Sequence, residues 1–219
     1  MLVYKFLTAE FGLKSLREKR VKLSTLDDFN DPFDLLPYDM TDRKNRAIVR
    51  EAARVWGKKH GVLCLSADWR DPVIWAHYAD KHKGLCLGFE VAEKTVRHVR
   101  YVDRRLPFPQ NPEAIEMEEA FNWFLTKFKN WAYEKEVRNW MELVDTYDGG
   151  LHFKSFDASL RLVKVIAGAR CPTPLQELQN AARPLTDVEF IKARAGFGEF
   201  EIVIDQRGFG GAGGSRTHE

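Results

Sequence analysis

The stretch from 71 to 90, DPVIWAHYADKHKGLCLGFE, constrains the fold most, because it specifies a helix, a turn and a strand in succession. Asp71 is suited to cap a helix, and Pro72 is suited to its first position. Gly84 favours the left-handed conformation that ends a helix. The apolar residues at 85, 87 and 89 then alternate as in a strand packed on a core. The sequence therefore predicts a helix that ends at Gly84, followed directly by a strand.

Aromatic and imidazole side chains share one face of this predicted helix. Trp75, Tyr78 and His82 occupy positions i, i+3 and i+7, which coincide on a helical surface. Such a face can line a pocket for a planar ligand. It can equally be half-buried core whose polar atoms are satisfied, and the sequence leaves both interpretations open.

The rest of the chain mixes helices and strands without a regular alternation. Strands are expected at 2–7, 21–23, 62–66, 97–103, 136–144, 161–169, 187–193 and 199–204. Helices are expected at 8–20, at 42–60, from Asn111 through an apolar stripe that ends at Trp131, and from Thr173 to Leu178. We therefore expect an α+β fold with several packed helices. Its sheet is expected to be mixed and mostly antiparallel, or to consist of two small sheets that form a cleft.

The totals indicate an ordinary soluble chain with one globular domain over 1–206 and a disordered glycine-rich tail over 207–219. The 34 Lys and Arg nearly balance the 32 Asp and Glu, so bulk charge does not indicate nucleic-acid binding. No apolar run reaches the roughly 18 residues of a membrane span, and the first residues lack a signal peptide's apolar region. We therefore expect a cytoplasmic protein with no membrane partner.

Cysteine and metal chemistry are not expected to dominate. Cys64, Cys86 and Cys171 form neither a disulfide framework nor a zinc-ligand pair, and the first two are expected to be buried thiols in strands. The motifs of phosphate-binding loops, serine hydrolases and zinc proteases are missing. His77 and His82 would point about 140° apart around a helix, so no metal is expected.

A pair of glutamates at 134 and 136 is the strongest candidate for acid or base chemistry. On a strand, Glu134 and Glu136 would point to the same face, where mutual repulsion can raise one pKa. One carboxylate can also bind a ribose hydroxyl or stabilise a developing cation. Arg138 would share that face and can instead neutralise the pair. Trp131 and Tyr133 place aromatic area beside the carboxylates, whereas the plainer interpretation is a charged strand edge in water.

Three stretches, FNDPFD, WAHYADKHKGLCLGFE and WAYEKEVR, resemble an uncharacterised bacterial family of the domain-of-unknown-function type. With the N-terminal strand that carries Tyr4-Lys5, the resemblance covers roughly residues 2 to 200. It implies no activity.

A weaker resemblance is to the ADP-ribosyltransferase superfamily, whose members bind NAD in a cleft between two small sheets. They use an N-terminal Arg or His, a Ser-Thr or Tyr on a middle strand, and a strand glutamate, often in E-x-E. The resemblance implies Glu136 as the catalytic carboxylate, with Glu134 beside it. Substrate contacts are implied for Tyr4 or Lys5 in the first position and for Ser24 or Tyr78 in the second.

We therefore hypothesise an NAD-dependent ADP-ribosyltransferase-like enzyme, or an NAD glycohydrolase, of a bacterial toxin or antiviral-defence type. NAD would be the substrate, and a strand glutamate would stabilise an oxocarbenium-like ribose. The acceptor, protein or nucleic acid, stays open. The further expected ligand contacts are Asn30, Asp31, Trp75, His77, Tyr78, His82 and Arg138.

Two alternatives belong to other functional classes. The aromatic and imidazole face could bind or sense a nucleotide without catalysis, with Glu134, Glu136 and Arg138 as a structural ion network. A metal-dependent nuclease or phosphodiesterase would instead use Asp31, His77 and Asp80 with a divalent cation.

Overall fold

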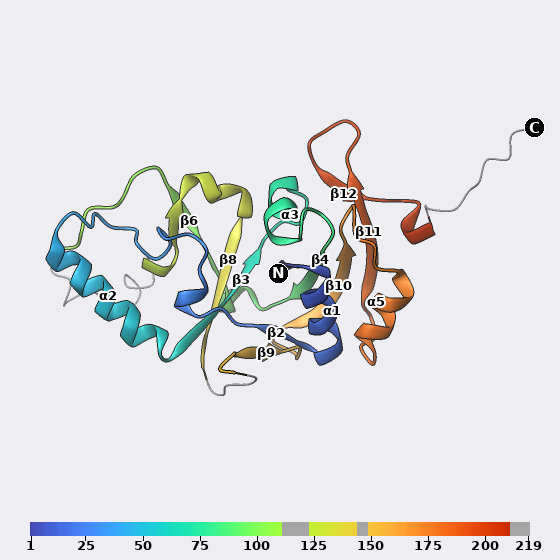
Figure 1. Ribbon diagram of the computed structural model, residues 1–219, viewed down its shortest axis with the longest axis horizontal. Helices are drawn as coiled ribbons and strands as arrows, with labels where there is room; N and C mark the ends of the chain where they lie inside the picture. The colour runs from blue at the N-terminus through green and yellow to red at the C-terminus, as the bar shows by residue number, and fades with distance from the viewer. Residues whose placement is uncertain (111–122, 144–148, 211–219) are drawn as a thin grey trace, which may run out of the picture. The chain divides into compact units, whose positions relative to one another are not determined.

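The computed structural model describes residues 1–110, 123–143 and 149–210 (Figure 1). Its helices and mixed, mostly antiparallel strands give an α+β fold, which confirms the predicted class. Contacts divide the chain into two units. Unit 1 comprises Met1–Arg20, Ala67–Val91 and Ser155–Glu219, and unit 2 comprises Val21–Ser66 and Ala92–Lys154.

Unit 1 is built on five strands in the order β12-β11-β10-β4-β1. They are β1 (Leu2–Leu7), β4 (Leu85–Glu90), β10 (Arg161–Ala167), β11 (Glu189–Ala195) and β12 (Ile202–Ile204). Strand β10 runs parallel to β11, and the other neighbours are antiparallel. All residues of β4 except the last are buried, because the strand lies between β1 and β10. Helices α1 (Ala9–Glu18) and α5 (Leu175–Ala182) contact each other.

Helix α3 (Pro72–Tyr78) begins as the sequence predicts but ends early. The Asp71 carboxylate accepts the N–H of Val73 at 2.7 Å, which is the expected cap. The next residues include Asp80, with a φ of 43°, and His82, with a φ of 72°. The prediction that His82 shares a helical face with Trp75 and Tyr78 is therefore wrong, because a left-handed turn follows the helix.

Unit 2 contains three antiparallel strands, with β8 (Glu136–Glu142) between β3 (His60–Ser66) and β5 (Arg97–His98). A separate parallel pair consists of β6 (Arg100–Val102) and β7 (Thr126–Phe128). Helix α2 (Arg43–Gly57) packs on a buried cluster that includes Tyr38, Val49, Trp123 and Phe124. The remaining described elements are β2 (Arg20–Lys22), which pairs with β9 (Phe153–Ser155), and the 3-10 turns η1 (Leu26–Asp28), η2 (Glu93–Thr95) and η4 (Lys129–Glu134).

The predicted helix from Asn111 to Trp131 is wrong in its second half. Residues 111–122 lie outside the described part, but Thr126–Phe128 is strand β7 and Trp131 belongs to η4. Pairing with β6 sets Tyr101 opposite Lys127, so tertiary contacts override the helical spacing of the apolar residues.

Other boundaries differ less from the prediction. Helix α2 ends at Gly57, and β3 already begins at His60, two residues before the predicted strand. In the predicted tail, Gly208–Gly210 forms a 3-10 turn, η5, and residues 211–219 lie outside the described part. The burial prediction holds for Cys86, whereas Cys64 is half-buried; neither forms a disulfide bond. Within the described ranges, no helix has the length and apolar character to cross a bilayer.

Candidate ligand-binding site

Five charged side chains form a buried ion cluster in unit 2. Its members are Asp34, Lys127, Glu134, Glu136 and Arg138, and each side chain is at most 6% exposed. Charged side chains are almost never buried to this extent unless they are paired. Three carboxylates meet two cations, so the cluster carries a formal excess of one negative charge.

Lys127 links all three carboxylates of the ion cluster. Its Nζ donates to Glu134 at 2.7 Å and to Glu136 at 3.3 Å, and it lies 3.3 Å from the Asp34 carboxylate. The ammonium also lies 4.9 Å from the centre of the Trp131 ring, a distance at which a cation and an aromatic face attract each other. Lys127 belongs to strand β7, and the pairing of this strand with β6 holds its backbone in place.

Arg138 completes the ion cluster from β8. Its Nε donates to one oxygen of Glu136 at 2.7 Å, and its Nη2 contacts both oxygens of Asp34 at 2.9 and 3.0 Å. Its Nη1 donates to the carbonyl of Phe124 at 2.6 Å, and its guanidinium lies 4.9 Å from the Phe29 ring centre. Each of the three guanidinium nitrogens therefore makes at least one of these contacts, which together hold the side chain in place.

The ion cluster shifts the pKa values of its members. Burial acts to raise the pKa of Glu136, but Arg138, Lys127 and the Cys64 thiol outweigh burial and lower that pKa to about 2. Burial acts to lower the pKa of Lys127, yet the carboxylates, Glu136 foremost, raise it. The pKa of Arg138 is also raised, by Glu136 and Asp34 against the effect of burial. Glu136 is therefore ionised at neutral pH.

The two glutamates lie close together because of a backbone conformation that the sequence did not predict. Glu134 ends the 3-10 turn η4, Lys135 is left-handed with a φ of 43°, and Glu136 opens β8. The expectation that both lie on one strand is therefore wrong, although both carboxylates reach Lys127. The alternative that Arg138 neutralises the pair holds for Glu136. An exposed, solvated strand edge is excluded because both side chains are buried.

A pocket of about 250 Å³ adjoins this cluster, and Lys127 belongs to both. Its apolar wall includes Phe33 and Phe128, whose side chains are 62% and 44% exposed. Arg104 and Arg105 are also among the lining residues. The remaining lining residues are Leu36, Pro37, Val102, Asp103 and Thr126.

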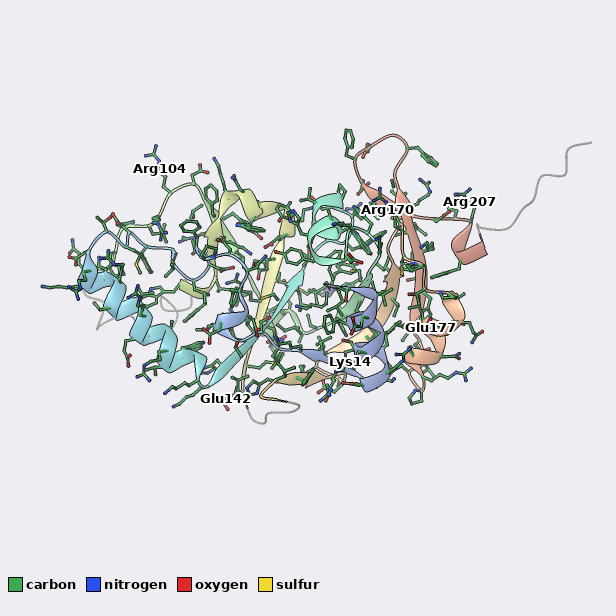
Figure 2. All side chains as sticks on the ribbon, in the orientation of Figure 1. Lys14, Arg104, Glu142, Arg170, Glu177 and Arg207 are labelled. Carbon is green, nitrogen blue, oxygen red and sulfur yellow. The ribbon has the colours of Figure 1, made fainter. Side chains whose placement is uncertain are left out.

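The two arginines of the pocket differ in how they are held. Arg105 donates to the carbonyls of Leu36 at 2.6 Å and Tyr38 at 3.1 Å, and its guanidinium lies 5.5 Å from the Phe33 ring centre. Arg104 projects away from the ribbon into solvent (Figure 2). The acidic lining residue, Asp103, is paired with Lys129 at 2.5 Å. The pocket therefore presents flat apolar surface together with cationic groups.

The predicted site residues of unit 2 have different roles. The Asp31 carboxylate is buried and accepts the N–H of Phe33 at 2.9 Å, so it stabilises the turn that carries the pocket wall. Asn30 is exposed, and the backbone of Ser24 pairs with Val62. Of the predicted residues in this unit, Glu134, Glu136 and Arg138 come together in the ion cluster.

Two of the predicted residues of unit 1, Trp75 and Tyr4, are buried. Trp75 is fully buried, donates from Nε1 to the carbonyl of Trp69 at 2.5 Å and packs edge-on against Phe6. Burial raises the pKa of Tyr4 to about 12, with Cys86 as the next cause.

Other candidates in unit 1 are closer to solvent. Lys5 and Tyr78 are half-buried, and His77 is exposed. The His82 ring stacks 6.4 Å from Trp75, and its Nδ1 has no hydrogen-bond partner among the described residues. The hypothesis that these residues share one cleft with Glu134 and Glu136 stays a prediction.

Sequence reasoning missed Asp34, Lys127 and the two pocket arginines. Asp34 lies in the FNDPFD stretch that was singled out for Asn30 and Asp31. Lys127 lies within the segment for which the spacing of apolar residues predicts a helix, so the sequence does not indicate that it binds carboxylates. The positions of Arg104 and Arg105 do not indicate a pocket either. The position of Asp34 between Phe33 and Leu35 was the available signal, because a carboxylate that is buried among apolar residues requires a charged or hydrogen-bonding partner.

Within the described ranges, no group of three or more His, Cys, Asp or Glu side chains is arranged to hold a metal ion. Comparison of the chain with protein-family models, curated proteins and solved structures finds no match. The chemistry of the pocket and of the ion cluster is therefore the basis for a functional proposal.

Proposed function

We propose that unit 2 is a binding module for a small anionic ligand with a flat apolar part, of the nucleotide class. The observation that carries this proposal is the pocket in which Phe33 and Phe128 stand beside Arg104 and Arg105. Aromatic faces suit a base or a nicotinamide ring, and guanidinium groups suit phosphate oxygens. The functional class is that of the non-catalytic alternative in the sequence analysis, although that alternative expected the nucleotide on the aromatic and imidazole face of Trp75, Tyr78 and His82.

The ion cluster supports the proposal by making one wall of the pocket rigid. A buried ion network is a weak source of net stability, because desolvation offsets most of the attraction. It does, however, hold Lys127 through three carboxylates and thereby fixes β7, which supplies Lys127 and Phe128 to the pocket. A preorganised wall lowers the entropy cost of binding.

The volume of the pocket limits the size of the ligand. Small-molecule sites typically enclose about 300–1,000 Å³, and this pocket has about 250 Å³. It therefore favours a single nucleotide, or one half of NAD, over a completely enclosed dinucleotide. AMP, nicotinamide mononucleotide and ADP-ribose are the compounds that best probe this range.

Thermal unfolding in the presence of these compounds tests the proposal. A ligand at about 100 times its Kd stabilises the folded state by about 2.7 kcal/mol, which raises the midpoint by several degrees. We expect AMP to raise the midpoint more than inorganic phosphate or adenosine at the same concentration, because it combines both features. Midpoints that no member of the panel changes at millimolar concentration would contradict the proposal.

An NAD-cleaving transferase or glycohydrolase is the second candidate. The observation in its favour is the meeting of the Glu134 and Glu136 carboxylates at Lys127, which also lines the pocket. Against it stands the enclosure of Glu136, whose ion pairs with Arg138 and Lys127 would have to open before the carboxylate could face a ribose.

Release of nicotinamide from NAD separates the candidates. Thermal stabilisation without release supports the binding module, release that survives EDTA supports the transferase or glycohydrolase, and release that EDTA abolishes supports a metal-dependent hydrolase. A folded Glu136→Gln variant that keeps full nicotinamide release would exclude Glu136 as the catalytic carboxylate. Glu142→Gln, at the exposed end of the same strand, is the matched control.

A further inference from the structure

Two loops of unit 1 form what we call the basic platform, residues 80–84 and 168–171. The first loop of the platform comes shortly after helix α3 in the sequence, the helix predicted to carry the aromatic and imidazole face. The platform belongs to unit 1, and none of its residues lines the pocket of unit 2. Its exposed cations are Lys81, Lys83 and Arg170. Arg170 is labelled in Figure 2.

Backbone hydrogen bonds join the two loops of the basic platform. The N–H of Gly168 donates to the carbonyl of Gly84 at 3.0 Å, and the N–H of Arg170 donates to that of His82 at 2.9 Å. A Cβ added at Gly168 would lie 2.3 Å from the carbonyl oxygen of His82, so the loops pack too closely for any larger residue. The Lys192 ammonium donates to the carbonyls of Gly168 and Cys171, each at 2.8 Å.

The turn that carries the lysines is strained. Asp80, Lys81 and His82 have φ values of 43°, 53° and 72°, a left-handed conformation that costs residues other than glycine free energy. The N–H groups of Lys81 and His82 donate back to the carbonyls of Ala76 and Trp75, each at 3.3 Å, which holds the turn in place. Strain that the surroundings maintain in this way is concentrated at functional sites.

The local charge of the basic platform differs from that of the whole chain. Of the platform's residues, Lys81, Lys83 and Arg170 are cationic and Asp80 is acidic, although the chain as a whole carries a formal charge of only +2; Lys192 beside the platform is also influenced by Asp205. Burial, and then the nearby Arg170, lower the pKa of His82.

Two rings precede the platform closely in the sequence. His77 and Tyr78, at the end of α3, have ring centres 6.2 Å apart, with His77 exposed and Tyr78 half-buried. The platform therefore combines exposed positive charge with imidazole and phenol rings that lie three and two residues before it in the chain.

We propose that the basic platform binds the phosphodiester backbone of a single-stranded nucleic acid. Lysine and arginine side chains neutralise successive phosphates, and aromatic rings beside them stack with unpaired bases. An acidic peptide would use the cations but would gain nothing from the rings, so the nucleic acid is the better match. The proposal involves unit 1 alone and does not depend on nucleotide binding by unit 2.

Fluorescence anisotropy with labelled DNA and RNA strands of about 20 nucleotides, longer than most single-domain binding sites, tests the proposal. The test variant is Lys81→Gln/Lys83→Gln/Arg170→Gln in the full chain. The control, Lys14→Gln/Arg161→Gln/Arg207→Gln, removes the same charge from other positions of unit 1. We expect the test variant to bind at least tenfold more weakly than the wild type and the control to bind within about threefold of it.

The salt dependence adds a second readout. Each phosphate contact with a single strand contributes about 0.7 to the slope of log affinity against log salt, so loss of three contacts lowers that slope by about 2. The control variant is expected to keep the wild-type slope. Circular dichroism checks that each variant is folded, and Lys83→Gln alone replaces the triple variant if that protein does not fold.

Four results would overturn the proposal. These are no binding by the wild type, equal weakening in both triple variants, competition by polyglutamate as effective as that by unlabelled strand, and binding of inorganic phosphate that the test variant loses, without binding of the strand. The second result would indicate bulk attraction, the third an acidic polymer, and the fourth a free phosphate compound.

Discussion

Arg138 and Asp34 lie 104 positions apart in the sequence, yet the arginine Nη2 contacts both carboxylate oxygens of Asp34 where neither side chain is exposed to solvent. The contact joins β8 to the turn before α2 within unit 2. Because Lys127 and the two glutamates share the same buried space, the ion cluster forms only when all these segments are in place. Removal of one member therefore leaves charges that water cannot reach.

Arg138→Met is expected to destabilise the protein by about 3–5 kcal/mol, because it leaves Asp34 and Glu136 buried without their main partner. Urea unfolding at neutral pH, followed by circular dichroism, measures this loss. Arg54→Met is the control, since Arg54 pairs with Glu51 on the exposed face of α2 and such pairs contribute about 0–1 kcal/mol. Equal losses in the two variants would show that the cluster is not buried in solution.

The low pKa of Glu136 predicts a loss of stability in acid. The folded state lowers this pKa from 4.5 to about 2, so the ionised carboxylate stabilises the folded state. The stabilisation is complete above pH 4.5 and is lost as the pH falls from 4.5 toward 2. The linkage amounts to about 3 kcal/mol over that range.

Free energies of unfolding at a series of pH values between neutrality and acid test this prediction. Glu136→Gln is expected to flatten the acid limb, whereas Glu142→Gln on the exposed end of β8 is expected to leave it unchanged. An acid limb that stays equally steep in Glu136→Gln would assign the pH dependence to other groups.

Gly84→Ala is expected to destabilise unit 1 by about 1–3 kcal/mol or more, because the new Cβ would lie 2.1 Å from the backbone oxygen of Leu7. Backbone atoms cannot move aside as a flexible side chain can. Gly198→Ala is the matched control, since nothing lies within 4 Å of its added Cβ. The midpoint of thermal unfolding distinguishes them, and an unchanged midpoint in Gly84→Ala would contradict the packing described for β1 and β4.

Local sequence signals predicted the elements whose cause is local. The cap at Thr8, which accepts the N–H of Phe11 at 3.3 Å, starts α1 where expected, and strand β1 has the predicted bounds. The hairpin of β11 and β12 also follows from alternating apolar residues around two glycines. Each of these signals depends on neighbours only a few residues away.

Long-range contacts explain what the sequence could not show. Strand β7 has a helical apolar spacing, but it pairs with β6 and its Lys127 reaches three carboxylates from separate segments. The early end of α3 depends on the left-handed turn that bonds to the loop at 168–171. The sequence predicted the contact between Glu136 and Arg138, because residues two apart on a strand share a face. It could not predict the ion pair between Arg138 and Asp34, which are far apart in the sequence and meet only in the folded chain.

The affinity of the full chain for AMP, measured by isothermal titration calorimetry in matched variants, tests the central claim most directly. Arg104→Gln removes a guanidinium from the pocket, and Arg50→Gln removes one from the exposed face of α2. We predict measurable binding by the wild type, at least tenfold weaker binding by Arg104→Gln, and unchanged binding by Arg50→Gln. Absence of binding by the wild type, or equal affinities in the two variants, would contradict a nucleotide site in this pocket.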